Sequence, residues 1–290
     1  MNPNEFMHGW AKRFYSGRMR SLTDVFKQPK PIIGMVHLMP MPGAPAYGGE
    51  SVDFIIENAL KDAHALVDGG VDGIIVENMW DLPYFVGKDV PPEEMTVHAV
   101  AAREVIRQAR VPAGITVIHN GGRVTLAIAK AAGAKFIRVD LLTGAYLWDT
   151  GELDHGNAAE LVRLRKQLYA DDVRFFVDVY KKHAITFPGL DPETHAIWSD
   201  FYMADALIVT GRMTGLETPK ELIERVKKAA PERPVLIGSG LTAANAEQLL
   251  SVADGAIVGT SIKYDGRTQN PVDPQRVAQL MSVVAKVRRS

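Results

Sequence analysis

Residues 70–77 read Gly-Val-Asp-Gly-Ile-Ile-Val-Glu, and three other stretches repeat this pattern. They are Gly133-Ala-Lys-Phe-Ile-Arg-Val-Asp140, Ala204-Asp-Ala-Leu-Ile-Val-Thr-Gly211 and Ala253-Asp-Gly-Ala-Ile-Val-Gly-Thr260. In each, a turn of small residues leads into a short apolar run that a polar residue or glycine closes. Continuous apolar runs after such turns are typical of parallel strands, because both faces of a parallel sheet are buried. The pattern therefore predicts repeated helix-to-strand joints.

Counting these units gives eight predicted strands, each followed by a predicted helix. The strands lie near residues 32–38, 73–78, 113–119, 136–140, 174–180, 206–211, 235–240 and 255–261. The helices lie near residues 51–68, 95–109, 122–132, 157–170, 192–202, 219–229, 243–251 and 274–287. Eight evenly spaced βα units favour one closed (β/α)8 barrel, a TIM barrel of residues 31–290, over an open doubly wound sheet. Three of the helices carry a start signal, an N-cap residue followed by proline: Asp191-Pro192, Thr218-Pro219 and Asp273-Pro274.

Residues 1–30 form an extension that precedes the first strand. They carry several Lys and Arg residues among aromatic ones, namely Phe6, Trp10, Phe14, Tyr15 and Phe26. A basic aromatic segment could associate with a membrane surface. We favour a helix that covers the bottom of the barrel or packs on a second subunit.

The composition excludes several classes of protein. Lys+Arg is 33 and Asp+Glu is 34, which gives a net charge of −1 and no reason to expect a nucleic-acid partner. The chain has no cysteine, so disulfides, thiolate catalysis and Cys-ligated metals are excluded. No secretory signal or membrane-spanning run is recognisable. We expect a cytoplasmic protein and, as for many barrels, a homo-oligomer.

The ends of the last two predicted strands have the pattern of a phosphate-binding site. Residues 237–240 read Ile-Gly-Ser-Gly and residues 258–261 read Val-Gly-Thr-Ser. Glycines let backbone N–H groups approach an anion, and these two loops are the usual phosphate site of the fold. The alternative is that the glycines only form tight turns. The candidate phosphate ligands are Gly238, Ser239, Gly240, Gly259, Thr260, Ser261 and Lys263, and Thr242 is a candidate cap for the next helix.

The other predicted strands end in polar residues, which would converge on the same rim of the barrel. A single polar strand end is commonly just solvated, whereas six on one rim indicate a binding or catalytic site. The candidate catalytic residues are His37, Glu77, His119, Asp140 and Asp178. The candidate substrate-binding residues are Asn78, Asn120, Arg138, Lys182, Thr210 and Gly211.

Asp140 and Asp178 end neighbouring predicted strands, so their carboxylates could be close. Two close carboxylates repel, which raises one pKa and produces a general acid or base. Alternatively, Arg138 or a lysine neutralises them and the cluster is an inert ion-pair network. The first interpretation predicts that Asp178→Asn abolishes turnover and leaves phosphate affinity intact.

Two further chemistries stay open at this stage. A Schiff base needs a lysine near a strand end, and Lys181 is the candidate that sequence offers. A divalent metal could use oxygen and nitrogen donors from separate strands, and no other cofactor is indicated. The five candidate donors are His37, Glu77, His119, Asp140 and Asp178, but no H-x-H or H-E-x-x-H motif supports the metal.

Two βα loops are unusually long, residues 38–49 and residues 141–156. The first is rich in proline and glycine, and the second carries Tyr146, Trp148 and Asp154. Long loops of this kind are typical of lids and specificity elements, although a subunit interface would also explain the aromatic residues.

Several of these stretches together resemble the BtpA/SgcQ family. They are Gly34-Met-Val-His-Leu-Met-Pro-Met-Pro-Gly43 with Tyr47-Gly-Gly, Glu77-Asn78, Phe136-Ile-Arg-Val-Asp140, Asp178-Val with Lys182-His183-Ala184, Ile208-Val-Thr-Gly-Arg-Met-Thr-Gly215, Gly238-Ser-Gly240 and Ile257-Val-Gly-Thr-Ser-Ile-Lys263. The resemblance covers about residues 30–280 and implies a TIM barrel of the phosphate-binding type, with no settled reaction. The chain departs from the family pattern at Asn120-Gly121, where Asn-Asp is expected, and at Asp140, where Asn is expected.

Two functions are consistent with the sequence. The first is an enzyme acting on a small phosphorylated metabolite, a sugar phosphate or nucleotide-like compound, by isomerisation, carbon–carbon cleavage or glycosidic cleavage; a metal-dependent hydrolase is a variant of it. The second, suggested by the family name, is a non-catalytic factor that assists assembly of a membrane complex, as photosystem I biogenesis requires. It would depend on residues 1–30, with peripheral membrane association, and not on the barrel mouth.

Overall fold

Eight parallel strands close into a barrel in the computed structural model, which describes residues 21–289 except 88 and 212. The barrel strands are β1 (Ile32–His37), β2 (Gly73–Glu77), β3 (Ala113–Thr116), β4 (Phe136–Val139), β7 (Arg174–Tyr180), β9 (Ala206–Val209), β10 (Val235–Ile237) and β11 (Gly255–Val258). They follow one another around the ring in chain order, and β11 pairs with β1 to close it. The predicted (β/α)8 barrel is confirmed.

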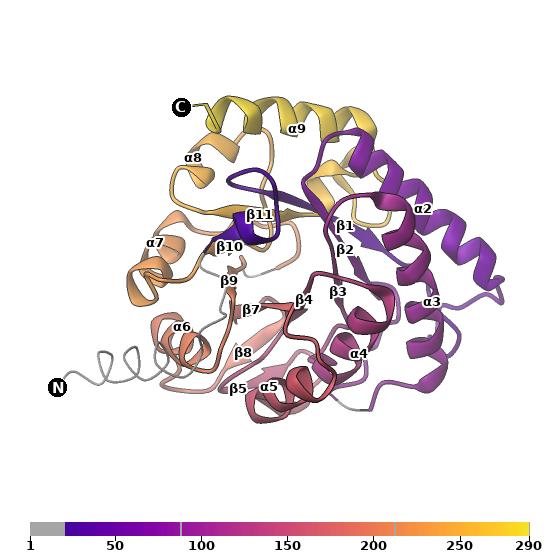
Figure 1. The fold of residues 1–290 in the computed structure, drawn as a ribbon, viewed down its shortest axis with the longest axis horizontal. Helices are drawn as coiled ribbons and strands as arrows, with labels where there is room; N and C mark the ends of the chain where they lie inside the picture. Colours follow the sequence, from indigo (N-terminus) through magenta and orange to yellow (C-terminus); the bar gives the residue numbers. More distant parts are fainter. Residues whose placement is uncertain (1–20, 88, 212, 290) are drawn as a thin grey trace.

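Helices alternate with these strands and surround the ring (Figure 1). They are α2 (Val52–Asp68), α3 (Pro92–Ala109), α4 (Gly122–Ala132), α5 (Ala158–Gln167), α6 (Pro192–Phe201), α7 (Lys220–Ala229), α8 (Ala246–Leu250) and α9 (Pro274–Val287). Asp191 and Asp273 cap α6 and α9 as predicted. The cap predicted at Thr218 is wrong, because its hydroxyl donates to the carbonyls of Val209 and Ser239 and α7 begins two residues later.

Apolar side chains fill the barrel interior at the end where the strands begin. The segment that precedes β1 covers this end. Leu22, in the short 3-10 helix η1 (Leu22–Asp24), and Phe26 join a buried cluster with inward-facing strand residues. The Phe26 ring contacts the Phe136 ring edge-on, with centroids 5.7 Å apart. Figure 1 shows this dark blue segment across the middle of the ring. The basic aromatic residues before position 21 lie outside the described residues.

A three-stranded antiparallel sheet lies over β4 and β7. It consists of β5 (Ala145–Trp148), β6 (Leu153–His155) and β8 (Ala184–Thr186), in the order β6-β5-β8. The long loop 141–156 is therefore a hairpin, paired with a strand from the loop after β7. Tyr146 and Trp148 are buried beneath this sheet, whereas Leu147 on its other face is exposed. Loop 38–49 forms consecutive turns instead.

No helix in the described part of the chain is long and apolar enough to span a membrane.

Candidate active site at the carboxyl ends of the barrel strands

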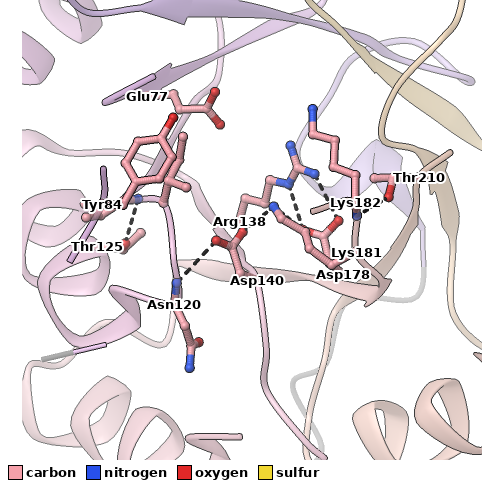
Figure 2. A network of polar contacts seen from close by, with 12 residues as sticks. Glu77, Tyr84, Asn120, Thr125, Arg138, Asp140, Asp178, Lys181, Lys182 and Thr210 are labelled. Carbon is pink, nitrogen blue, oxygen red and sulfur yellow. Dashed lines mark hydrogen bonds and ion pairs between the residues drawn. The ribbon is translucent and has the colours of Figure 1, made fainter. Parts of the chain in front are cut away.

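Two buried ion pairs lie side by side where β4 and β7 end (Figure 2). Arg138 binds Asp178 with two hydrogen bonds, 2.8 Å from Nε to Oδ2 and 2.9 Å from Nη2 to Oδ1. Lys181 Nζ lies 2.6 Å from Asp140 Oδ1 and 3.5 Å from Asp178 Oδ2. All four side chains are at least nine-tenths buried. Removing one member of such a pair lowers the stability of the fold, because the charge of the other member stays buried without a partner.

Strand geometry explains this cluster. Alternate residues of a strand share a face, so Arg138 points into the barrel and Asp140 follows on the same side. Arg138 pairs in register with Phe176, which directs Asp178, two residues later, toward the same interior. A break in the β7–β9 register after Asp178 then turns the chain and brings Lys181 back over both carboxylates.

Both carboxylates are thus matched by cations. Burial alone would raise the pKa of Asp140, but the adjacent Lys181 ammonium and the Arg138 guanidinium hold it below its usual value. The predicted proximity of Asp140 and Asp178 is present in the structure. The contacts correspond to the neutralised alternative, in which Arg138 and Lys181 are the counter-ions of the two carboxylates.

His37 and Glu77 end the adjacent strands β1 and β2 and contact each other, with His37 Nε2 3.5 Å from Glu77 Oε1. Burial raises the pKa of Glu77, although the charges of Arg138 and Lys182 oppose this. Burial lowers the pKa of His37 well below its usual value, as do Lys263 and Lys182. The surroundings therefore favour a neutral His37, whose buried Nδ1 has no hydrogen-bond partner within the described residues, and they make Glu77 easier to protonate than an ordinary glutamate.

Lys182 extends over the ion pairs without joining them. Its backbone N–H donates to Thr210 Oγ1 at 3.0 Å, and that hydroxyl donates to the Tyr180 carbonyl at 2.8 Å. Thr210 thus fixes the turn that carries the lysine. Burial, together with the nearby Arg138 charge, lowers the pKa of Lys182 to about 8. Figure 2 shows its ammonium on the same side of the Arg138–Asp178 pair as the Glu77 carboxyl group.

A cavity of about 420 Å³ connects these groups with the predicted phosphate loops. The polar and glycine residues that line it are His37, Glu77, Arg138, Lys182, Thr214, Gly215, Gly238, Ser239, Gly240, Thr242, Gly259, Thr260, Ser261, Gly266, Arg276 and Gln279. Within the described residues, the backbone N–H groups of Gly240, Gly259 and Thr260 donate to no carbonyl or side chain. Unpaired N–H groups on glycine-rich loops are suited to an anion.

The side chains of these loops are used within the protein. Ser239 Oγ accepts from Gly211 N–H at 3.2 Å, and Ser261 Oγ donates to the Leu241 carbonyl at 2.6 Å. Thr260 Oγ1 contacts Thr268 Oγ1 at 2.8 Å. An anion here would be held mainly by the backbone.

Lys263 does not reach this cavity, contrary to the sequence-based expectation. Its Nζ lies 3.2 Å from Asp62 Oδ2 and the residue is 2% exposed. The same carboxyl group accepts from Val272 N–H at 2.8 Å. Lys263 therefore ties the segment after β11 to α2.

A second cavity of about 390 Å³ adjoins the first, and Glu77, Met79, Arg138, Lys182 and Thr214 line both. Its other walls are largely apolar and aromatic, with Leu82, Pro83, Tyr84, Ile118, His119 and Trp148 among them. The His119 ring stacks on the Trp148 indole with centroids 4.5 Å apart. The barrel mouth thus has a side lined by glycine-rich loops and an aromatic side, and Glu77, Arg138 and Lys182 lie where they meet.

Three further predicted residues shape the loops and line neither cavity. Asn78 Oδ1 accepts from Ile118 N–H at 2.8 Å. Asn120 Nδ2 donates to Asp154 Oδ2 at 2.8 Å and thereby ties the loop after β3 to β6. Gly211 approaches the Glu217 carbonyl so closely that a Cβ would lie 2.7 Å from its oxygen. Each role is architectural within the described residues.

The five candidate metal donors do not form one ligand group. No cluster of three or more His, Asp or Glu side chains suited to a metal occurs among the residues that the structure describes. Only His37 and Glu77 present adjacent donors that also line the first cavity. Asp140 and Asp178 already bind Lys181 and Arg138.

Some cavity residues were not predicted. Thr214 lies in a stretch that resembles the BtpA/SgcQ family, residues 208–215. The resemblance could therefore have indicated Thr214 as a site residue. Tyr84 carries no local pattern. It reaches the rim because its hydroxyl donates to the Met79 carbonyl at 2.7 Å.

Comparison with known proteins places the fold and the site in context. Over 271 residues, the chain is 38% identical to the photosystem I biogenesis protein BtpA of Synechocystis, and the alignment covers 93% of each chain. It is 34% identical to the sgc region protein SgcQ of Escherichia coli K12, covering 93% of this chain and all of that one. A solved thiamine phosphate pyrophosphorylase from Pyrococcus furiosus has the same fold, with a TM-score of 0.54 and 13% identity over 89% of this chain and 96% of that one. Residues 28–286 match the model of the BtpA family, and the chain belongs to that family.

Proposed function

We propose that this protein is an enzyme that acts on a small phosphorylated metabolite, a sugar phosphate or a nucleotide-like compound. The observation that carries the proposal is the single cavity that joins the glycine loops after β10 and β11 to Glu77, His37 and Lys182. Non-catalytic scaffolds have no need for buried titratable groups beside an anion site. The fold is shared with an enzyme whose name includes a phosphate ester, which is consistent with this function.

The geometry supports distinct roles for the groups around the cavity. Glu77, with its raised pKa, would donate or accept a proton at the substrate, and the neutral His37 would orient it. Arg138 would present its positive guanidinium to the substrate while Asp178 holds it in place. Asp140 and Lys181 would act as positioning residues beneath the site. Chemistry of this kind fits isomerisation or cleavage of a bond next to a carbonyl or glycosidic carbon.

The experiment is a thermal unfolding screen against phosphorylated compounds, each paired with its unphosphorylated form. A ligand at 100 times its Kd stabilises the folded state by about 2.7 kcal/mol, which shifts the Tm by a few degrees. The matched variant is Gly259→Ala. The added methyl group would lie 3.4 Å from Met35 and 3.6 Å from His37, so it is tolerated but faces the cavity.

We expect Gly259→Ala to keep the Tm of the free protein and to lose most of the shift caused by the phosphorylated members. Equal shifts with both members of each pair, or an unchanged shift in the variant, would contradict the phosphate site. No shift with any compound would remove the support for the enzyme.

A second function, assembly of a membrane complex, is favoured by one surface feature. Leu147 lies opposite Leu153 and Ile185 in register across the small sheet, and all three side chains are exposed. An exposed apolar row of this kind marks a surface for a partner or a second copy of the chain. Leu153→Glu with Ile185→Glu should abolish association, measured as molecular mass in solution and as binding to membrane vesicles. An unchanged mass and unchanged vesicle binding would exclude this surface.

A further inference from the structure

The charges at the barrel mouth leave one amine without a counter-ion. Three cations and three carboxyl groups lie there, all of them buried except the half-buried Lys182: Arg138, Lys181, Lys182, Glu77, Asp140 and Asp178. Arg138 pairs with Asp178 and Lys181 pairs with Asp140. Within the described residues, no carboxylate lies within ion-pair distance of the Lys182 ammonium, and Glu77 contacts only His37. Lys182 and Glu77 are thus the two ionisable groups that the ion-pair network does not use.

Lys182 also occupies the position a reacting group needs. It lines both cavities, so it lies where the side lined by glycine-rich loops meets the aromatic side. Its backbone is fixed through Thr210, which leaves only the side chain to adapt to a ligand. Lys181 is excluded from this role because its Nζ is bound 2.6 Å from Asp140.

The surroundings make the uncharged form of the amine more accessible than in an ordinary lysine. Burial, the Arg138 charge and the Lys181 charge lower the pKa of Lys182 to about 8, and burial raises the pKa of Glu77. A lysine that only bound phosphate would be better as an ammonium ion with its usual pKa. An amine that loses its proton more readily than an ordinary lysine, on the same cavity as a carboxyl group with a raised pKa, is instead suited to addition to a carbonyl and loss of water.

We propose that Lys182 forms a Schiff base with the aldehyde or ketone carbon of a phosphorylated substrate and that Glu77 supplies the proton. The Lys182 nitrogen would attack the carbonyl carbon, and a proton transfer from nitrogen to oxygen gives the neutral carbinolamine. Glu77 then protonates the hydroxyl group, water leaves, and the nitrogen lone pair forms the C=N⁺ bond. This deepens the proposed function and rests on it, since the phosphate loops would hold the other end of the substrate.

The test is reductive trapping with cyanoborohydride. The full-length protein is incubated with glyceraldehyde 3-phosphate or with glyceraldehyde, and the modified residue is identified by peptide mass spectrometry. We expect one adduct per chain, on Lys182, formed at least tenfold faster with the phosphorylated aldehyde and slowed by inorganic phosphate. Trapping should increase with pH and reach half of its maximum near pH 8, where ordinary lysines are still charged.

Three variants complete the test. Lys182→Arg should lose the adduct and keep its Tm, and Glu77→Gln should slow trapping at least tenfold while phosphate still raises its Tm. Lys220→Arg, an exposed lysine on α7, is the matched control and should trap like the wild type. Comparable adducts on several lysines, or equal rates with both aldehydes, would overturn the proposal. Stabilisation by phosphorylated compounds without any adduct would reject the Schiff base and keep the proposed function, whereas the absence of both would reject both.

Discussion

At the scale of single residues, the contribution of an ion pair to stability depends on how deeply the pair is buried. The side chains of Arg138 and Asp178 are 3% and 0% exposed. If one of them is removed, water therefore cannot readily solvate the charge of the other. Removing one member of a buried pair typically costs about 3–5 kcal/mol, because the other charge stays buried and unpaired. By contrast, an exposed pair such as Arg123–Glu160 contributes at most about 1 kcal/mol.

This contrast predicts the effect of Asp178→Asn. We expect it to lower the free energy of unfolding by several kcal/mol, while Glu160→Gln changes it by less than about 1 kcal/mol. Urea unfolding followed by circular dichroism measures both. Any loss of turnover in Asp178→Asn would then follow from the displacement of Arg138, not from a missing acid or base. Similar stability of the two variants would show that Asp178 is not the counter-ion that the structure indicates.

A second residue-level prediction concerns His195 on α6. It is fully buried, and its Nδ1 lies 2.9 Å from the Val179 carbonyl. Burial lowers its pKa to about 4. The unfolded chain, with an ordinary histidine pKa, therefore binds the proton first as the pH falls below about 6.5. The stabilisation by neutral His195 is complete above that pH and is lost progressively toward pH 4.

The stability difference between the wild type and His195→Gln should accordingly shrink by about 2 kcal/mol between pH 7.5 and pH 5. Urea unfolding of both proteins at several pH values measures it. Burial also raises the pKa of Asp81 to about 6 and of Glu94 to about 7, with the opposite effect on stability. Both proteins contain these groups, so their contribution cancels. A pH-independent difference would mean that His195 is not buried in its neutral form.

At the scale of elements, the turn before α8 supports the loop at Gly240, which we propose binds phosphate. Thr242 N–H donates to Asn245 Oδ1 at 2.8 Å, and Asn245 N–H donates to Thr242 Oγ1 at 3.3 Å. Thr242 thus closes the turn at residues 243–245, and the prediction that it caps α8 is wrong, because the N-cap of α8 (Ala246–Leu250) is Asn245. Asn245 Nδ2 also donates to the Gly240 carbonyl at 3.0 Å and to Glu217 Oε2 at 2.8 Å. One side chain thus joins the loops after β9 and β10.

Asn245→Ala should therefore affect binding more than folding. Loss of side-chain hydrogen bonds of this kind costs about 1 kcal/mol of stability each, and we expect the Kd for a phosphorylated ligand to rise roughly tenfold as the Gly240 loop loses its support. Thermal unfolding with increasing ligand measures both quantities. Asn58→Ala is the control, since Asn58 Nδ2 bonds only the Phe54 carbonyl on the surface of α2. A Kd unchanged by Asn245→Ala would mean that the Gly240 loop does not contact the phosphate.

The elements themselves were largely readable from sequence, whereas their ends were not. Apolar runs placed all eight barrel strands, because parallel strands must be buried on both faces. The predicted strand 113–119 nevertheless stops at Thr116, since Val117 N–H bonds Thr125 Oγ1 and not a neighbouring strand. Sequence also placed Asp140 beside Asp178. The sequence could not show which of the two adjacent lysines, Lys181 or Lys182, binds these carboxylates. The turn after β7 decides this, and in the structure Lys181 is the one that binds Asp140.

At the scale of the molecule, the barrel interior is divided along its axis. Apolar side chains fill the end where strands begin, and charged side chains fill the end where they finish. The apolar end is completed by Leu22 and Phe26, which come from outside the strands. We therefore propose that the folding unit begins before Leu22, and not at the first strand near residue 31. Apolar packing at one end of the barrel and buried ion pairs at the other both contribute to stability, and the two cavities lie at the charged end.

This division predicts how far the chain can be shortened. Removing residues 1–28 deletes Leu22 and Phe26, which are 4% and 1% exposed, and opens the interior beneath Phe136 and Phe176. Deleting one buried phenylalanine side chain alone costs about 3–5 kcal/mol, so we expect this truncation to unfold at a much lower temperature than one that removes residues 1–20. Only the shorter truncation can test whether the extension binds a partner or a membrane without disturbing the barrel. Equal Tm values for the two truncations would show that the barrel folds without Leu22 and Phe26.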